Sequence, residues 1–268
     1  SPVYDNAKVL ARLEAIRRRK PLTGRLVYEM TPEGGIDDAS IRFVEDENGP
    51  LRLYELPREG EPYVIGGDTA EGGIDWSAAS VRNNLTWQQA ATWRGHTDTD
   101  LYAKQMYCLG RAYNDALIGV EINFDSHPIK ELTRLGYPHL YVRQKMDTIT
   151  ERTVDNFGWR TTSTTRPLLI DAHITLAREQ IDTFNDPVTL QEMLTFVRDE
   201  LGRPAALDGE HDDTVFADAI ALAIRSQQRF YKEVEPEPEP ELPWALRTDD
   251  DPTRLTDEQA AKKAWLWS

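Results

Sequence analysis

Residues 63–68 read YVIGGD, five uncharged residues that end in a carboxylate. A run this short and apolar predicts a buried strand, and residues 77–83 and 89–95 predict two more strands. Three successive strands favour an antiparallel meander. Apolar residues at helical spacing follow over 98–113, so this stretch predicts the start of an α/β domain.

The chain beyond residue 113 alternates strand and helix patterns. Strands are predicted at 117–122 and 140–142, and helices at 128–135, 166–180, 187–200 and 213–231. The intervening residues 147–166 are rich in Thr and Ser and lack periodicity, which indicates a long exposed loop. Loops of this length in compact domains are often functional.

Before residue 63 the pattern is less regular. A short amphipathic helix is predicted over 7–20, and short apolar runs separated by turn signals over 22–62 predict a hairpin-like lead-in. We therefore expect a lead-in over 1–59, one domain over 60–232 and a tail over 233–268.

The tail begins with a Pro-Glu repeat at 233–241, which predicts an extended, self-repelling linker. Trp244, Trp265 and Trp267 follow it. These residues indicate either a short helix that docks back on the domain or a segment that binds a partner.

The composition excludes several classes of protein. Of 268 residues, 40% are hydrophobic, enough for a core, and 29% are charged; no apolar run reaches the length of a transmembrane helix. We expect no secretory signal peptide at 1–10. The single cysteine, Cys108, excludes an internal disulfide or a cysteine-based zinc site. The net charge of −15 opposes DNA binding by phosphate neutralisation alone, although about −6 of it belongs to the tail.

Acidic residues stand where predicted strands end or a helix begins. Asp68 closes the first strand, Glu121 closes the fourth, and Asp212 and Asp213 open the last helix. Each has an ordinary alternative: a turn cap, an ion pair or a helix N-cap. However, strand ends in α/β folds meet at a common edge, and an ionised carboxylate after the apolar residues 117–120 needs a partner.

Carboxylates that converge on one edge form a site for Mg²⁺ or Mn²⁺, which prefer oxygen ligands and suit phosphate substrates. Two ions would activate a water molecule and stabilise the leaving oxygen of a phosphodiester. The predicted reaction is phosphodiester hydrolysis with Mg²⁺ or Mn²⁺, using two ions.

Five segments in this order resemble the C-terminal nuclease domain of the large terminase subunit of tailed bacteriophages. They are YVIGGDTAEG at 63–72, VEIN at 120–123, GWRTT at 158–162, TRPLL at 165–169 and HDDTVFADA at 211–219. The resemblance covers about residues 60–230. It implies an α/β, RNase H-like fold with a mixed central sheet flanked by helices. It also implies metal-dependent cutting of concatemeric double-stranded viral DNA in the host cytoplasm.

By position, the resemblance implies that Asp68 is the first metal ligand, bridging both ions, and that Glu121 is the second. Asp213, or Asp212 with it, supplies the helix ligand, with Asp213 preferred. Asp218, about one turn further along, is a reserve candidate.

Three nearby residues have less definite roles. Asn123 matches a polar position of the family, and Ser126 stands where many relatives have glycine, so the local turn is in doubt. His211 either orients a water molecule or ligand, or is purely structural.

Basic residues near the proposed site are candidates for phosphate contacts. They are Arg143, Lys145, Arg152, Arg160 and Arg166. Their alternative is solvated loop charge, and we expect weak, salt-sensitive DNA binding by so acidic a chain.

The resemblance implies a portal protein and a small terminase subunit as partners, and an ATPase domain normally on the same polypeptide. The sequence contains no Gly-x-x-x-x-Gly-Lys-Ser/Thr motif, so we do not expect this chain to hydrolyse ATP by itself.

Two other functions remain open. One is a different RNase H-like nuclease, of the resolvase or integrase type, which would prefer branched DNA. The other is a non-catalytic module that docks on a portal or capsid protein through the acidic linker and Trp-containing tail, with structural carboxylates.

Overall fold

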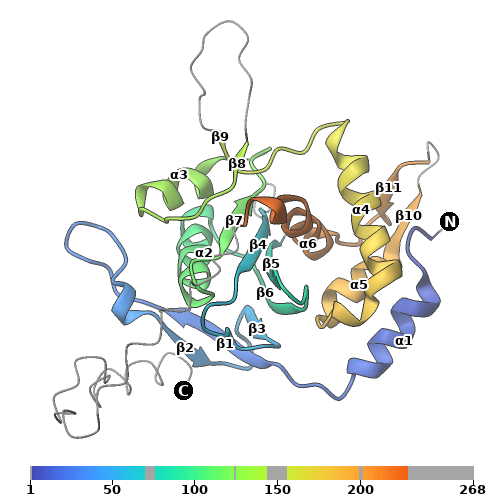
Figure 1. Cartoon of the computed structure of the whole chain (residues 1–268), viewed down its shortest axis with the longest axis horizontal. Coiled ribbons are helices and arrows are strands. Elements are labelled where there is room, and N and C mark those ends of the chain that lie inside the picture. Colours follow the sequence, from blue (N-terminus) through green and yellow to red (C-terminus); the bar gives the residue numbers. More distant parts are fainter. Residues whose placement is uncertain (1, 70–75, 124, 144–155, 199–201, 229–268) are drawn as a thin grey trace, which may run out of the picture.

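A seven-stranded mixed sheet forms the centre of the protein (Figure 1). The computed structural model describes residues 2–69, 76–123, 125–143, 156–198 and 202–228. The strand order is β2-β1-β3-β6-β5-β4-β7, and every neighbouring pair is antiparallel except the parallel pair β4/β7. The strands are β1 (Leu22–Val27), β2 (Arg42–Glu45), β3 (Leu51–Leu53), β4 (Tyr63–Asp68), β5 (Ser77–Asn83), β6 (Gln89–Gly95) and β7 (Leu117–Val120).

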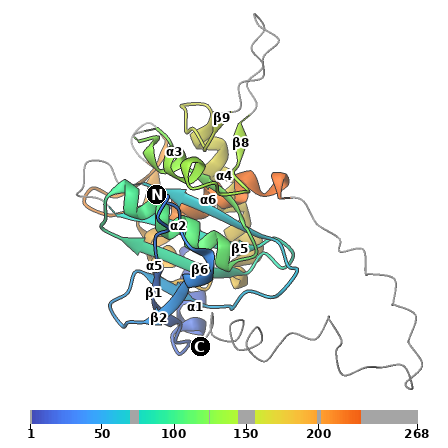
Figure 2. The ribbon, with the colours of Figure 1, turned by 90° about the vertical axis from the view of Figure 1, so that its left-hand side faces the viewer.

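Helices cover both faces of this sheet (Figures 1 and 2). On one face lie α2 (Thr99–Ala112) and α3 (His127–Arg134). On the other lie α1 (Asn6–Ile16), α4 (Thr165–Gln180), α5 (Pro187–Thr195) and α6 (Asp213–Ile224). Short 3-10 turns are η1 (Asp38–Ser40), η2 (Ile181–Thr183) and η3 (Arg225–Gln227). Each layer of helices closes its own hydrophobic core against the sheet.

Two glycines in β4 allow both layers to approach the sheet closely. A Cβ atom at Gly66 would lie 2.0 Å from the carbonyl oxygen of Ala217 in α6, and one at Gly67 would lie 2.4 Å from the hydroxyl of Tyr102 in α2. Larger residues would push the helices outward. The Gly-Gly pair therefore fixes where α6 crosses the sheet.

The predicted meander is confirmed, since β4, β5 and β6 have the expected bounds and pair antiparallel. The predicted lead-in over residues 1–59 contributes strands to the central sheet. Strands β1 to β3 belong to the same sheet and join it through β6, so no break in the sheet marks the expected boundary between residues 59 and 60.

Several predicted helices are shorter in the structure. The helix predicted over 187–200 is wrong beyond Thr195, because β10 (Phe196–Arg198) pairs with β11 (Pro204–Ala206) and buries Phe196. Helix α1 ends at Ile16, its last buried residue, rather than at residue 20. Helix α6 ends at Ile224 and continues only as η3.

The structure differs from the prediction in the region of the expected fifth strand and long loop. The strand expected at 140–142 consists of a single parallel bridge between Leu140 and Ile118, followed by β8 (Val142–Arg143), which pairs with β9 (Asn156–Phe157). Residues 144–155 and the tail predicted from residue 233 lie outside the described residues. No helix in the described ranges is both long and apolar enough to cross a membrane.

Candidate active site

A cavity of about 390 Å³ opens at the edge of the sheet where β4 and β7 end. Its wall carries four carboxylates, one arginine, five side chains with hydroxyl or amide groups and one aromatic ring. These residues are Asp68, Thr69, Glu121, Asn123, Thr161, Thr162, Ser163, Arg166, Asp212, Asp213 and Phe216.

Strand register brings the first two carboxylates together. Strands β4 and β7 are parallel with Gly67 opposite Val120. Asp68 and Glu121 directly follow these two residues, so they lie side by side. The Glu121 N–H donates to the Gly67 carbonyl at 2.9 Å, which continues the pairing to this edge. Asp212 and Asp213 reach the same cavity from the N-terminus of α6. The expected convergence of the four carboxylates is therefore observed.

Like charges and burial dominate the electrostatics of the cavity. Burial raises the pKa of Asp68 well above its ordinary value, and the negative charges of Glu121, Asp213 and Asp212 raise it further. Burial also raises the pKa of Asp212, an effect that Arg166 opposes. The ionised forms of Asp68 and Asp212 are therefore disfavoured in this cavity, and a bound cation would stabilise them.

Two arginines approach the acidic pair of α6. The Arg166 guanidinium lies 3.6 Å from Asp212 Oδ2 and stacks over Phe216, with 4.2 Å between its Cζ and the ring centre. The Arg94 guanidinium, from β6, lies 3.8 Å from Asp213 Oδ2. His211 Nδ1 is 3.7 Å from the same oxygen, which is compatible with the orienting role considered for it.

A glutamate that the sequence analysis missed holds the first turn of α6. Glu192, on α5, accepts hydrogen bonds through Oε2 from the backbone N–H groups of Thr214 at 2.9 Å and Val215 at 3.0 Å, and from the Thr214 hydroxyl. Burial raises the pKa of Glu192 to about 7. Its only sequence signal is a charge on the buried face of α5, between Leu190 and Met193.

The polar wall of the cavity is tied to the end of β7. The backbone of Trp159 forms a parallel β-bridge with Glu121. The backbone N–H of Trp159 donates to the Val120 carbonyl at 2.8 Å. The Asn123 side chain then bonds both backbone groups of Thr161, accepting from its N–H at 3.0 Å and donating to its carbonyl at 2.6 Å. Asn123 thereby fixes the segment that presents Thr161, Thr162 and Ser163 to the cavity.

Other residues singled out in the sequence lie away from the cavity wall. Arg160 is exposed, and neither it nor Arg143, in β8, lines the cavity. Ser126 is the N-cap residue of α3 but forms no side-chain cap. Lys145 and Arg152 lie outside the described residues.

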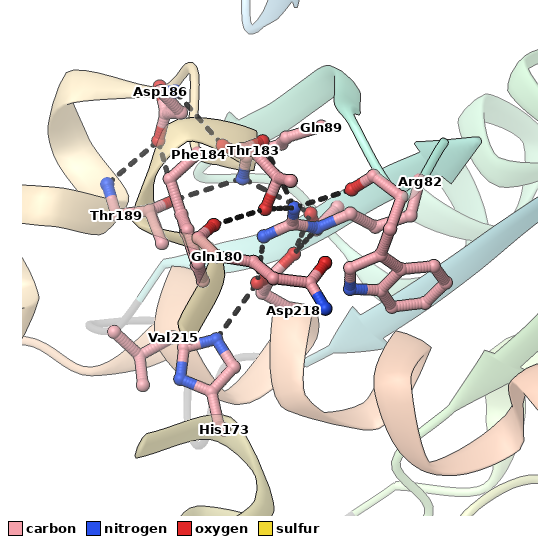
Figure 3. A network of polar contacts seen from close by, with 12 residues as sticks. Arg82, Gln89, His173, Gln180, Thr183, Phe184, Asp186, Thr189, Val215 and Asp218 are labelled. Atoms are coloured by element: carbon pink, nitrogen blue, oxygen red, sulfur yellow. Dashed lines mark hydrogen bonds and ion pairs between the residues drawn. The ribbon is translucent and has the colours of Figure 1, made fainter. Parts of the chain in front are cut away.

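Asp218, the reserve candidate for metal binding, belongs to the core instead (Figure 3). Its carboxylate accepts from Arg82 Nε at 2.8 Å and Nη2 at 2.6 Å, and from the Ser80 hydroxyl at 2.5 Å. It also bonds His173 Nε2 at 2.8 Å, and His173 Nδ1 bonds the Tyr4 hydroxyl at 2.8 Å. All of its oxygen capacity serves this buried network, because residue 218 faces the sheet whereas residues 212 and 213 lie at the open end of the helix.

The donor set of the cavity fits a hard divalent cation. Carboxylate, hydroxyl and amide oxygens line it, and these are the ligands that Mg²⁺ and Mn²⁺ prefer. In the described part of the chain, no three His, Cys, Asp or Glu side chains are arranged to hold one ion as they stand. Asp212 and Asp213 each lie within ion-pair distance of an arginine, at 3.6 Å from Arg166 and 3.8 Å from Arg94.

No family model and no curated protein matches the chain. The solved structures that match it include the large terminase nuclease of the thermophilic phage G20c with bound magnesium. It is 20% identical, with a TM-score of 0.51 over 82% of this chain and 97% of that one. A cobalt-bound structure of the same nuclease gives the same values.

The large terminase nuclease domain of Thermus phage P74-26 is 21% identical, with a TM-score of 0.50 over 80% of this chain and 93% of that one. The expected fold is therefore confirmed: the chain has the α/β, RNase H-like fold of large terminase nuclease domains.

Proposed function

We propose that this chain is the metal-dependent endonuclease domain of a phage DNA-packaging terminase. It would cut concatemeric double-stranded DNA by two-metal phosphodiester hydrolysis with Mg²⁺ or Mn²⁺. The observation that carries the proposal is the meeting of Asp68, Glu121, Asp212 and Asp213 in one cavity. The shared fold supports it, as does the magnesium bound by the G20c nuclease.

The four carboxylates would hold the metal ions. We propose that Asp68 would be shared by both ions and that Glu121 and Asp213 would be the other principal ligands, with Asp212 beside them, since all four line the same cavity. The ions would supply an activated water molecule and charge stabilisation for the leaving oxygen.

The remaining polar groups of the cavity would bind the DNA backbone. Arg166 lies in the cavity wall and is about two-fifths exposed, so its guanidinium can exchange Asp212 for a phosphate oxygen. The hydroxyls of Thr161, Thr162 and Ser163 add neutral donors on the same wall. Arg143 and Arg160, which do not line the cavity, would bind phosphates further from the scissile bond, and Lys145 is proposed as a further phosphate contact.

The acidic character of the chain predicts that these contacts are weak alone. With a net charge of −15, the domain would depend on other components to hold DNA. We propose that an ATPase domain of the same polypeptide, a small terminase subunit and a portal protein supply that affinity and the choice of cutting site. We propose that the protein acts in the host cytoplasm, in a bacterium infected by phage or carrying a prophage.

Cleavage of supercoiled plasmid tests the proposal. We expect nicking and linearisation with Mn²⁺ or Mg²⁺, none with EDTA, and none for Asp68→Asn or Glu121→Gln. Asp171→Asn is the matched control, because it makes the same chemical change at an exposed position of α4.

Full activity of Asp68→Asn would contradict the site. A strong preference for branched over linear DNA would indicate a resolvase-type nuclease. Inactivity under every metal, together with partner binding lost on deletion of residues 233–268, would favour the docking module.

A further inference from the structure

The N-terminus of α6 is capped by another helix rather than by its own N-cap residue. Asp212 occupies the N-cap position but its side chain makes no capping hydrogen bond. The N–H groups of Thr214 and Val215, which an N-cap carboxylate ordinarily binds, instead donate to Glu192 of α5.

The other helices with an aspartate at this position show the usual arrangement. Asp5 accepts from the Lys8 N–H in α1, Asp98 from the Leu101 N–H in α2, and Asp186 from the Thr189 N–H in α5. All three have extended backbone angles, whereas Asp212 has φ −134° and ψ 10°. Among the described α-helices that begin at an aspartate, α6 is therefore the one whose aspartate makes no capping bond.

Arg94 holds the other side of this arrangement. Its guanidinium lies 3.7 Å from Glu192 Oε1 and 3.8 Å from Asp213 Oδ2. It also stacks on Trp76, with 4.4 Å between its Cζ and the ring centre. Glu192 thus binds the helix amides with one oxygen and a fixed cation with the other, and the same cation faces the second acidic residue of α6.

We propose that Glu192 is a positioning residue: by capping α6 from α5, it releases the carboxylate of Asp212 from helix capping and keeps it available to the cavity. Without Glu192, the two amides would have no acceptor, and Asp212 would be the nearest carboxylate able to take that place. The proposal rests on the proposed function for its consequence, metal binding, but the exchange of caps can be measured without metal.

The first test is a thermal double-mutant cycle in EDTA. In the wild-type background, Asp212→Ala removes no capping bond, so we expect Tm to change by less than about 1 °C. In the Glu192→Ala background we expect Asp212 to have become the cap. The substitution Asp212→Ala should then lower Tm by about a further 2–4 °C. Equal effects in both backgrounds would overturn the proposal.

The second test measures Mn²⁺ affinity by calorimetry with the full chain. Glu192→Ala should weaken binding about tenfold, the usual effect of losing a residue that orients a ligand. Glu192→Gln keeps an acceptor oxygen for the amides and should bind within about threefold of wild type. If Glu192→Ala does not fold, Glu192→Asp replaces it, because the shorter side chain cannot reach the amides.

Asp186→Ala is the matched control for general destabilisation. Asp186 accepts both the N–H and the hydroxyl of Thr189, as Glu192 does for Thr214, but it does not line the cavity. We expect it to lower Tm without weakening Mn²⁺ binding. Equal loss of affinity in Asp186→Ala and Glu192→Ala would contradict a specific role for Glu192.

The two proposals fail in different ways. If wild type binds no Mn²⁺ but the cycle shows the exchange of caps, the proposed metal site is wrong and the capping role stands. If wild type binds Mn²⁺ and Glu192→Ala binds equally well, the capping role is wrong and the site stands.

Discussion

Replacing Asp218 with Asn should destabilise the protein far more than any single change among the cavity carboxylates. Asp218 is fully buried and pairs with Arg82, whose side chain is also fully buried. The substitution preserves shape but removes the charge, so the Arg82 cation would remain in the core without its counter-ion (Figure 3).

The expected magnitude follows from these contacts. Asn can still accept from Arg82 Nε and the Ser80 hydroxyl, but its amide nitrogen cannot accept from Arg82 Nη2, which lies 2.6 Å from Asp218 Oδ2. Leaving a buried charge uncompensated costs about 3–5 kcal/mol. At roughly 2–4 °C per kcal/mol for a domain of this size, Tm should fall by about 10 °C.

The loss should also depend on pH. Burial alone would raise the pKa of Asp218, but Arg82 and the hydrogen bonds from His173 and Arg82 outweigh it and lower the pKa well below the ordinary value. A lowered folded-state pKa stabilises the protein fully above the unfolded-state value, about 4, and this contribution is lost as pH falls further. The difference between wild type and Asp218→Asn should therefore shrink below about pH 4.

The assay is urea unfolding and thermal melting in EDTA, with Asp213→Asn as the comparison on the same helix. We expect Asp218→Asn to lose stability, whereas Asp213→Asn keeps it within about 1 kcal/mol and loses cleavage. If Asp218→Asn melts within about 2 °C of wild type, the buried Asp218–Arg82 pair does not contribute the expected stability.

Three further predictions concern the cavity and its support. Asp68→Asn should leave the metal-free Tm unchanged or raise it, because it removes the repulsion that raises the pKa of this carboxyl; a clear fall in Tm in EDTA would contradict this. Gly66→Ala should lower Tm by about 5 °C or more and reduce cleavage, since its Cβ would meet the Ala217 carbonyl at 2.0 Å; a neutral melting curve would show that α6 can shift freely. Arg166→Ala should weaken DNA binding and reduce the slope of log affinity against log salt by about 1, measured by fluorescence anisotropy; an unchanged slope would exclude a phosphate contact.

The sequence predicted those parts of the site that depend on local pattern. Apolar runs that end in a carboxylate placed Asp68 and Glu121 at strand ends, and the parallel pairing of β4 and β7 then brought them together. Asp212 and Asp213 were found because a strongly apolar helix follows them. Each of these signals lies within a few residues of the functional group.

The features that were missed depend on contacts between distant segments. Glu192 reaches α6 across 22 residues, and Arg82 pairs with Asp218 across 136. Neither partner is visible in local periodicity, so Asp218 looked like a possible ligand rather than a core residue. The strand at Phe196–Arg198 was missed for the same reason. Its local sequence continues the helical pattern of α5, but its pairing with β11 makes it a strand.

The central claim is that the cavity carboxylates hold divalent metal, and an anomalous difference map from Mn²⁺-soaked crystals tests it most directly. We predict anomalous peaks inside the cavity, within ligand distance of carboxylate oxygens of Asp68 and at least one of Glu121, Asp212 and Asp213, and their absence in Asp68→Asn. Peaks only elsewhere on the protein, or an empty cavity at millimolar Mn²⁺, would contradict the account.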